Sequence, residues 1–100
     1  MKLLTKAIEQ ELEKHPLYST DGQNVKQVIV KFFNPCGAGT WFVCEGEKQE
    51  NGDWLFFGLV ELLEKEWGYF TLSELQSLKL PFGMSIERDM HYENKTISIE

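Results

Sequence analysis

Residues 51–62 have the sequence NGDWLFFGLVEL, and this stretch decides the fold. The Asn51-Gly52 pair tolerates the positive φ angles of a tight turn, and such a pair between two apolar runs is a strong β-hairpin signal. The flanking runs, 40–47 and 54–62, are rich in the aromatic and β-branched residues typical of strands. Gly58 lies inside the second run, where a glycine indicates a bulge or a close approach by another group. We therefore expect an antiparallel hairpin with a local irregularity at Gly58.

Further strands are predicted on both sides of this hairpin. Residues 25–33, VKQVIVKFF, form one continuous strand candidate whose centre is apolar on both faces, which suggests a helix covering one side. Residues 68–70 predict a short strand or an extended entry into the following helix. Residues 86–92 and 96–99 predict a last pair of strands joined by a turn at residues 93–95.

Two helices complete the predicted fold. Thr5 can cap a helix that ends near His15, because the following Pro16 disfavours helical geometry at the residue before it. Residues 71–74, Thr-Leu-Ser-Glu, fit the capping box of a second short helix near residues 72–79. The sequence therefore predicts an α+β fold: a small, mainly antiparallel sheet with an N-terminal helix and a second short helix, with residues 1–100 forming a single domain.

Composition and charge restrict the function. The chain has 100 residues, with 10 Lys and Arg against 16 Asp and Glu, for a net charge of −6. Most of the excess is local: residues 35–70 hold two bases against seven acids, a difference of −5. No stretch has the density of basic residues that nonspecific nucleic-acid binding requires, and an anionic membrane surface is disfavoured for the same reason. A basic protein is the partner class that this charge favours.

The N-terminus and the cysteines bear on the compartment. The first fifteen residues become charged after two leucines and lack the apolar core of a signal peptide, so we expect a cytoplasmic protein without a membrane partner. In that compartment Cys36 and Cys44 are expected to stay reduced.

Several segments in the same order resemble a known family. These segments are Lys31-Phe32-Phe33-Asn34-Pro35, Thr40-Trp41 with Glu45, Phe57-Gly58-Leu59-Val60, residues 68–75 (GYFTLSEL) and Ile86-Glu87-Arg88-Asp89. Together they resemble the bacterial, plasmid and phage proteins catalogued as domain of unknown function 2958, over nearly the whole chain. The resemblance implies no particular activity. It does imply a mobile-element setting and a role in the conflict between host and element, or in maintenance of the element.

One stretch could carry metal chemistry. On a single strand, Glu87, Asp89 and His91 would share a face, and a neighbouring strand could bring Glu45 or Glu66 beside them. Neighbouring positions on one strand face are about 6.6 Å apart, so these side chains would not converge on one ion without help. A metal-dependent hydrolase is therefore an alternative hypothesis, and a solvated strand face is the simpler interpretation.

Arg88 is the only arginine in the chain. Its planar guanidinium can hold a carboxylate at two points. A structural ion pair is the first interpretation, and the binding of a phosphate or of a partner's carboxylate is the alternative.

The 13 aromatic residues suggest two uses. Most of them should build the core, but consecutive pairs must place one ring on each side of the sheet, and exposed rings would suit a protein partner. A stacking platform for single-stranded nucleic acid is a further alternative, although the aromatic series lacks interleaved cations in sequence.

The leading hypothesis is a non-enzymatic interaction module that binds a basic protein through an acidic, aromatic surface. The candidate partner-binding residues are Trp41, Glu45, Glu66, Tyr69 and Arg88. No catalytic residue, metal ion or cofactor is predicted. An acidic surface of this kind could also imitate nucleic acid toward a host defence protein.

Overall fold

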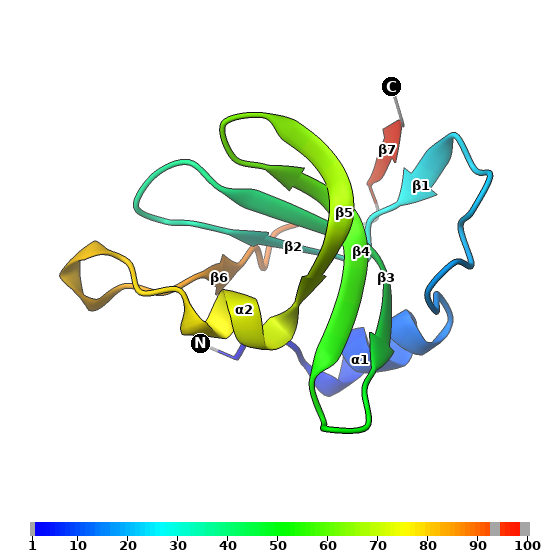
Figure 1. Ribbon diagram of the computed structural model, residues 1–100, viewed down its shortest axis with the longest axis horizontal. Coiled ribbons are helices and arrows are strands. Elements are labelled where there is room, and N and C mark those ends of the chain that lie inside the picture. Colours follow the sequence, from blue (N-terminus) through cyan, green and yellow to red (C-terminus); the bar gives the residue numbers. More distant parts are fainter. Residues whose placement is uncertain (1, 93–94, 99–100) are drawn as a thin grey trace.

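The computed structural model describes residues 2–92 and 95–98, which form two sheets and two α-helices (Figure 1). In chain order the elements are α1 (Lys6–Glu13), β1 (Val25–Gln27), β2 (Val30–Phe33), β3 (Thr40–Lys48), β4 (Trp54–Glu61), β5 (Lys65–Thr71), α2 (Leu72–Ser77), the 3₁₀ turn η1 (Pro81–Gly83), β6 (Glu87–Arg88) and β7 (Thr96–Ser98). A five-stranded antiparallel sheet has the order β5-β4-β3-β2-β6, and β1 pairs with β7 in a separate ribbon. The predicted α+β fold is confirmed.

The hairpin predicted from residues 51–62 is present as β3 and β4. Gly52 has a φ of 89°, in the region that favours glycine, and Gln49 and Asp53 are joined by a backbone hydrogen bond across the turn. The next strand, β5, is longer than the predicted residues 68–70. It pairs with β4 over its whole length, from Lys65 to Thr71, because the ladder of hydrogen bonds extends beyond the residues with high strand propensity.

The backbone of the neighbouring strand approaches Gly58 closely, which is one of the two explanations predicted for a glycine inside this strand. A Cβ atom on Gly58 would lie 1.8 Å from the backbone oxygen of Phe42. The irregularity is on the partner strand, where the register of β3 against β4 shifts between Val43 and Glu45. This bulge turns the residues after it to the opposite face, so that Glu45 pairs with Phe57.

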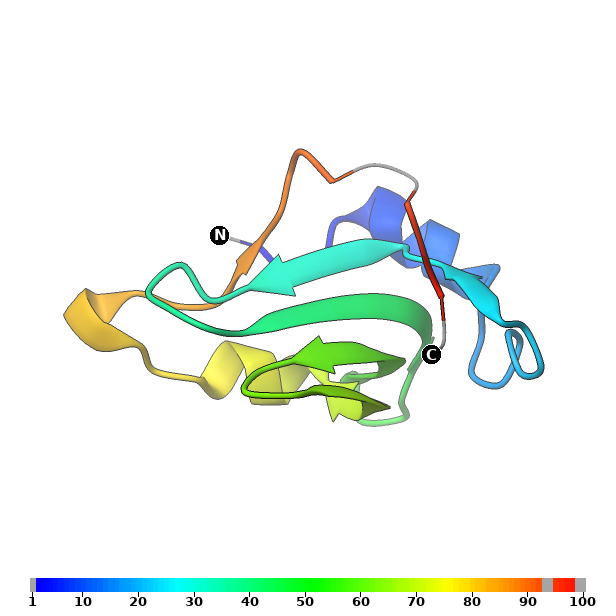
Figure 2. The ribbon, with the colours of Figure 1, turned by 90° about the horizontal axis from the view of Figure 1, so that it is seen from above.

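The prediction of one continuous strand over residues 25–33 is wrong. The stretch is divided between β1, which pairs with β7, and β2, which pairs with β3 and β6. The change of partner occurs at the two residues between β1 and β2. Val28 donates its N–H to the carbonyl of Lys95, and Ile29 donates its N–H to the carbonyl of Val43. The two halves are separated because they pair with different, distant segments of the chain. Figures 1 and 2 show the β1–β7 ribbon beside the main sheet.

The predicted pairing of residues 86–92 with 96–99 is also wrong over the described residues, which exclude 93–94 and 99. The first segment contributes only β6, which pairs with β2, and the second contributes β7, which pairs with β1. The strand ends at Arg88 because the Asp89 side chain accepts the N–H of His91 and starts a turn. His91 therefore does not continue the strand face of Glu87.

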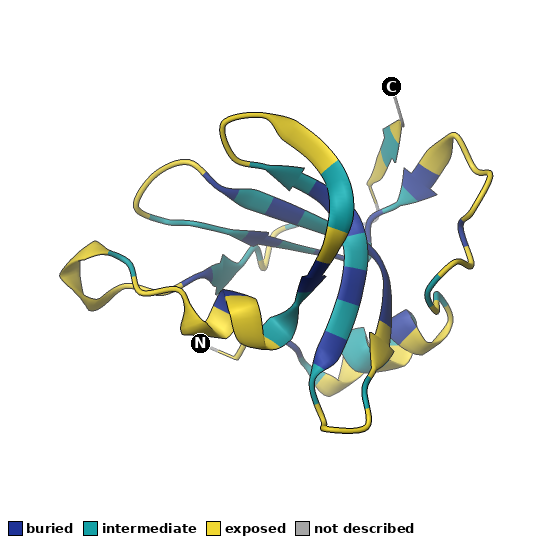
Figure 3. Cartoon of the chain, viewed as in Figure 1, coloured by how far each residue is buried: buried dark blue, intermediate teal, exposed yellow. Residues whose placement is uncertain are grey.

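The core lies on the sheet face that the helices cover. Both predicted caps are present: Thr5 Oγ1 accepts from Ile8 N at 3.2 Å and Thr71 Oγ1 accepts from Glu74 N at 3.1 Å. The first helix packs against β3, and α2 packs against β4 and β5. The buried cluster comprises Leu3, Leu4, Leu12, Val30, Phe32, Trp41, Val43, Trp54, Phe56, Phe70, Leu75 and Ile86. Burial is concentrated in the middle of the sheet, and the turn between β4 and β5 is exposed (Figure 3).

Candidate functional site

The five predicted partner-binding residues do not form one surface. Glu66 and Tyr69 lie on β5 and Arg88 lies on β6, and these strands are the two opposite edges of the main sheet. Trp41 and Glu45 lie on β3, in the middle of the sheet, and both are buried. A docking surface must therefore be built from a different set of residues.

Trp41 belongs to the core. Its exposed fraction is 7%, and it packs within the buried cluster opposite Val60 of β4. The alternation of β3 before the bulge places Trp41 and Val43 on the face that the helices cover. A docking role that requires an exposed indole does not fit this position, and the hypothesis is corrected for Trp41.

Glu45 holds a loop of the chain in place. Its side chain is 1% exposed, and its carboxylate accepts the N–H groups of Tyr18 at 2.8 Å and Thr20 at 3.0 Å. The Thr20 hydroxyl also donates to this carboxylate. A neighbouring carboxylate, that of Glu47, accepts the N–H of Leu17 at 3.2 Å. The loop after α1 is therefore attached to β3 through its backbone, and Glu45 has a structural role instead of the predicted docking role.

A buried lysine completes the same network. The Nζ atom of Lys26 is 2.7 Å from the hydroxyl oxygen of Thr20, which therefore accepts from Lys26 and donates to Glu45. The Lys26 side chain is 3% exposed, and its ammonium lies 5.8 Å from the centre of the Phe57 ring. Each charge in this network has hydrogen-bond partners, which is the condition under which buried charges are tolerated.

Arg88 connects the N-terminal segment to the edge of the sheet. One guanidinium nitrogen donates to the backbone oxygens of Lys2 and Leu3, the latter at 3.2 Å. These contacts hold the segment before α1 against β6. Through these carbonyl groups Arg88 has a structural role.

Tyr69 lies in an aromatic group on the face of the sheet opposite the core. Its ring centre is 5.1 Å from that of Phe57, which is 5.9 Å from that of Trp67. The side chain is 52% exposed. Partial desolvation and a hydrogen bond with the Tyr18 side chain raise the pKa of Tyr69. Of the five predicted residues, Tyr69 and Glu66 are the exposed ones.

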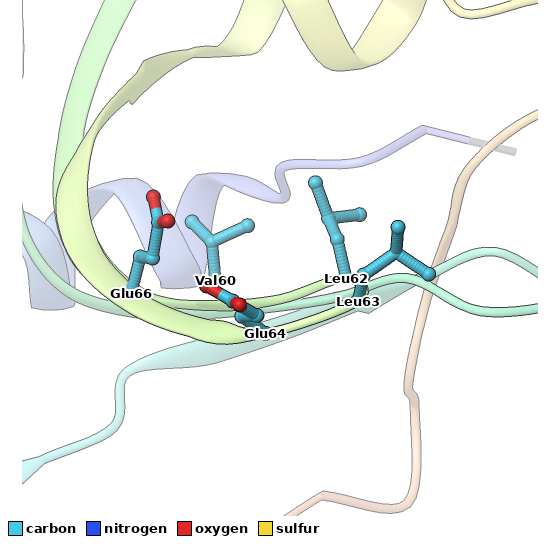
Figure 4. Close-up of a pocket in the computed structure, with 5 residues that line it drawn as sticks. All are labelled: Val60, Leu62, Leu63, Glu64 and Glu66. Atoms are coloured by element: carbon cyan, nitrogen blue, oxygen red, sulfur yellow. The ribbon is translucent and has the colours of Figure 1, made fainter.

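The turn between β4 and β5 carries a surface that the sequence hypothesis missed. Leu62 is 55% exposed and Leu63 is 98% exposed. With three neighbours these leucines line a depression of about 430 Å³, and Figure 4 shows Val60, Leu62 and Glu66 projecting to one side of the hairpin. We call this surface the hairpin patch; it consists of Val60, Leu62, Leu63, Glu64 and Glu66. The available signal was the Leu62-Leu63 pair itself, because a turn between two strands is normally polar.

The residues of the metal hypothesis are spread over the sheet. Glu66 is on one edge, Glu87 is on the other edge, and Glu45 is buried between them. Asp89 forms an ion pair with Lys31, with 3.5 Å between Oδ2 and Nζ. Within residues 2–92 and 95–98, no group of three His, Cys, Asp or Glu side chains is close enough to hold a metal ion. The metal hypothesis therefore has no cluster to rest on in the described part of the chain.

Cations do lie over aromatic rings, which the linear sequence did not reveal. The Nζ atom of Lys31 is 5.6 Å from the ring centres of both Phe42 and Tyr92. However, Lys31 is already paired with Asp89, and Lys26 is buried against Thr20. These two ammonium groups are therefore already engaged by other groups of the chain.

The two cysteines lie in different environments. Cys36 is exposed, whereas Cys44 is buried at the bulge of β3. Burial raises the pKa of the Cys44 thiol to about 12, and the effect of burial exceeds the opposing attraction of Lys26. Because the thiolate is the nucleophile, Cys44 is unsuited to covalent catalysis near neutral pH.

A family model described as "Protein of unknown function (DUF2958)" matches residues 3–99. No curated protein and no solved structure gives a significant match. In the described ranges, neither α-helix has the length and apolar composition needed to cross a membrane.

Proposed function

The chain belongs to the DUF2958 family of proteins of unknown function, and from this premise we propose that it is a non-enzymatic interaction module that binds a basic protein through the hairpin patch. The proposal retains a protein-interaction function but assigns it to the hairpin patch instead of the residues predicted from the sequence. Glu66 remains part of it, and Leu62 and Leu63 replace the buried Trp41 as apolar anchors.

The observation that carries the proposal is the exposure of two adjacent leucines at a projecting turn. Burying a leucine side chain contributes roughly 1.5–3 kcal/mol, and this contribution is not realised for Leu63 in the isolated chain. Together with Val60 these side chains form one contiguous apolar area beside carboxylates. Contiguous exposed apolar areas with a polar rim are typical of protein interaction sites.

The charge of the patch selects the class of partner. Glu64 and Glu66 line the depression, and Glu61 lies at the end of β4, just before the turn. Lys65, at the start of β5, is the one base among residues 60–66. A partner segment that presents aliphatic side chains flanked by Lys or Arg would match both the leucines and the carboxylates. Such charge complementarity increases the association rate and makes binding sensitive to salt.

The setting that the family resemblance implies makes the proposal more specific. A basic partner on the host side would be a defence protein, and on the side of the element it would be a maintenance protein. An acidic, projecting hairpin could occupy the nucleic-acid site of such a partner. This finer proposal follows from the sign of the charge and is tested with the same partner.

The proposal is tested by affinity capture and by titration of the recovered partner. Immobilised wild-type protein is compared with the Leu62→Ser/Leu63→Ser double variant in a bacterial lysate, at about 50 mM and about 300 mM salt. We expect wild-type protein to recover a basic protein at low salt and less of it at high salt. The purified partner should then bind the double variant at least about tenfold more weakly.

The matched control is Met90→Ser, which removes an exposed apolar side chain just beyond the opposite edge of the sheet. This variant should bind as wild type does. Equal binding by the double variant would overturn the proposal. Recovery of nucleic acid in place of a protein would instead support the nucleic-acid alternative, and a metal-dependent hydrolytic activity would support the hydrolase.

A further inference from the structure

The hairpin patch lies beside an open sheet edge. Strand β5 is the first strand of the five-stranded sheet, and in the described residues its only ladder partner is β4. It is seven residues long, whereas β6 at the opposite edge has two residues. Every second N–H and C=O group of an edge strand points away from its neighbour, so β5 offers a template for another strand.

The two faces of β5 have different chemistry along this edge. Trp67 and Tyr69 share the face that carries the aromatic group. Glu66 and Gly68 alternate with them on the opposite face, and Glu66 lines the hairpin patch there. A strand added to this edge would therefore meet apolar rings on one face and a carboxylate on the other.

Gly68 leaves room at the centre of the edge. A Cβ atom added to Gly68 would have no heavy atom within 4 Å, although the residue is half-buried in the sheet. A bulky side chain on a neighbouring strand can cover such a glycine from the adjacent position. Gly68 therefore favours a large residue at the facing position of an incoming strand.

We propose that the outer edge of β5 binds an extended segment of the partner as an added antiparallel strand. The segment places Lys or Arg opposite Glu66, a bulky residue opposite Gly68, and aliphatic residues opposite Trp67 and Tyr69. Main-chain hydrogen bonds supply affinity, and the alternating side chains supply specificity. The antiparallel direction matches the rest of the sheet and is the more stable pairing. The inference rests on the proposed function and specifies its binding mode.

A basic segment is favoured over a second copy of this chain by charge. The chain carries a net charge of −6, and pairing two β5 edges would bring the acidic hairpins of both copies together. A partner segment with Lys or Arg beside Glu66 replaces this repulsion with attraction. The second copy therefore becomes an outcome of the test.

The test uses synthetic seven-residue peptides with blocked ends and the full-length protein. In antiparallel register the parent peptide has valines opposite Tyr69 and Trp67, phenylalanine opposite Gly68 and lysine opposite Glu66. Two derivatives carry methyl groups on the backbone nitrogens of alternate residues. One derivative is methylated at the odd-numbered residues of the peptide and the other at the even-numbered residues, so that each blocks the amides on one side of the strand. Binding is followed by titration calorimetry and by amide chemical shifts.

We expect the parent peptide to bind and to shift the amide signals of β5. Methylation of one set of amides should weaken binding by at least about tenfold, since it removes two or three hydrogen bonds, and methylation of the other set should leave it nearly unchanged. Glu66→Lys should weaken binding by about two- to fivefold, and a peptide with glutamate in place of its lysine should restore it. The matched control, Glu50→Lys in the exposed β3–β4 turn, should bind as wild type does.

Several results would overturn strand addition. These are no binding of the parent peptide, equal effects of the two methylated sets, or a peptide-independent dimer joined through β5. The proposed function is judged separately. If the methylated sets behave alike while the Leu62→Ser/Leu63→Ser variant loses its partner, the hairpin patch is the docking surface and strand addition is wrong.

Discussion

Glu45 and Glu66 are acidic residues of one charged segment, yet the structure uses them in opposite ways. Glu45 lies on the central strand β3, is 1% exposed and accepts hydrogen bonds from Tyr18 and Thr20. Glu66 lies on the edge strand β5, is exposed and lines a depression beside Leu62 and Leu63. The contrast teaches that a local excess of acidic residues does not by itself identify a docking surface.

The bulge in β3 accounts for the position of Glu45. Without the register shift after Val43, strict alternation would point Glu45 into the helix-covered core, where a carboxylate has no partners. The shift places it opposite Phe57 instead, beneath the loop that carries Tyr18 and Thr20. The close packing of Gly58 against Phe42 accompanies this shift. The different environments of Glu45 and Glu66 therefore depend on a backbone irregularity as well as on charge.

The largest expected effect is the loss of the buried carboxylate. Glu45→Ala leaves two loop N–H groups and the Thr20 hydroxyl without their acceptor and Lys26 without a compensating charge. We expect the free energy of unfolding to fall by about 3 kcal/mol. Urea denaturation measures the loss. A decrease below about 0.5 kcal/mol, as for an ordinary surface residue, would show that the network contributes little.

The next effect tests the bulge. In Gly58→Ala the new Cβ would be 1.8 Å from the Phe42 oxygen, so the backbones of β3 and β4 must move apart. We expect a loss of about 2–3 kcal/mol in urea denaturation. Hydrogen exchange at the amides of Tyr18 and Thr20 should also accelerate, because Glu45 is displaced.

The control for Gly58 is Gly37→Ala, since a Cβ on Gly37 would meet nothing within 4 Å. Its stability should stay within about 0.5 kcal/mol of wild type. If the amides of Tyr18 and Thr20 still exchange slowly in Gly58→Ala, the bulge does not determine the position of Glu45.

A half-buried acid provides an intermediate case. Asp53 accepts hydrogen bonds from the hydroxyl of Ser73 at 2.6 Å and from its N–H at 3.1 Å, at the start of α2. The Ser73 hydroxyl, followed by backbone N–H groups of Trp54 and Ser73, lowers the pKa of Asp53 despite slight desolvation. We expect Asp53→Ala to cost about 1 kcal/mol at neutral pH, because the N–H of Ser73 in the first turn of α2 loses its side-chain acceptor, as it does when a cap residue is removed.

The pH dependence of this effect follows from the direction of the shift. A lowered pKa in the folded state means that the stabilisation is complete above the ordinary value of 3.8 and is lost as the pH falls through the folded-state pKa. The difference between wild type and Asp53→Ala should therefore shrink in urea denaturation as the pH falls below 3.8 and through the folded-state pKa of Asp53. Glu50→Ala, in the same turn, serves as the control. A difference that is constant with pH would assign the loss to packing.

The smallest expected effect on stability is at the exposed acid. Glu66→Gln should leave the free energy of unfolding within about 0.5 kcal/mol of wild type, because its carboxylate is in water. The same substitution should weaken binding of a basic partner by about two- to fivefold. A large loss of stability in Glu66→Gln would show that Glu66, like Glu45, has a structural role.

Several sequence predictions succeeded because they depend on neighbouring residues. The Asn51-Gly52 turn and the caps at Thr5 and Thr71 are confirmed, and each is set by groups within four residues along the chain. Glu66 and Tyr69 are exposed, and their role in binding a partner stays a prediction. Trp41 and Glu45 were misplaced, because their exposure depends on which face of the sheet the helices and the loop after α1 cover.

The amino-acid sequence by itself determined the fold class, the turns, the helix caps and the acidity of the middle segment, because these depend on composition and on local backbone preferences. Only the tertiary structure decided where residues 25–33 divide between two sheets, which way Glu45 points after the bulge, and that β5 is an open edge beside the hairpin patch. These features depend on hydrogen bonds and packing between segments far apart in the chain, and no local pattern records which partners those segments find.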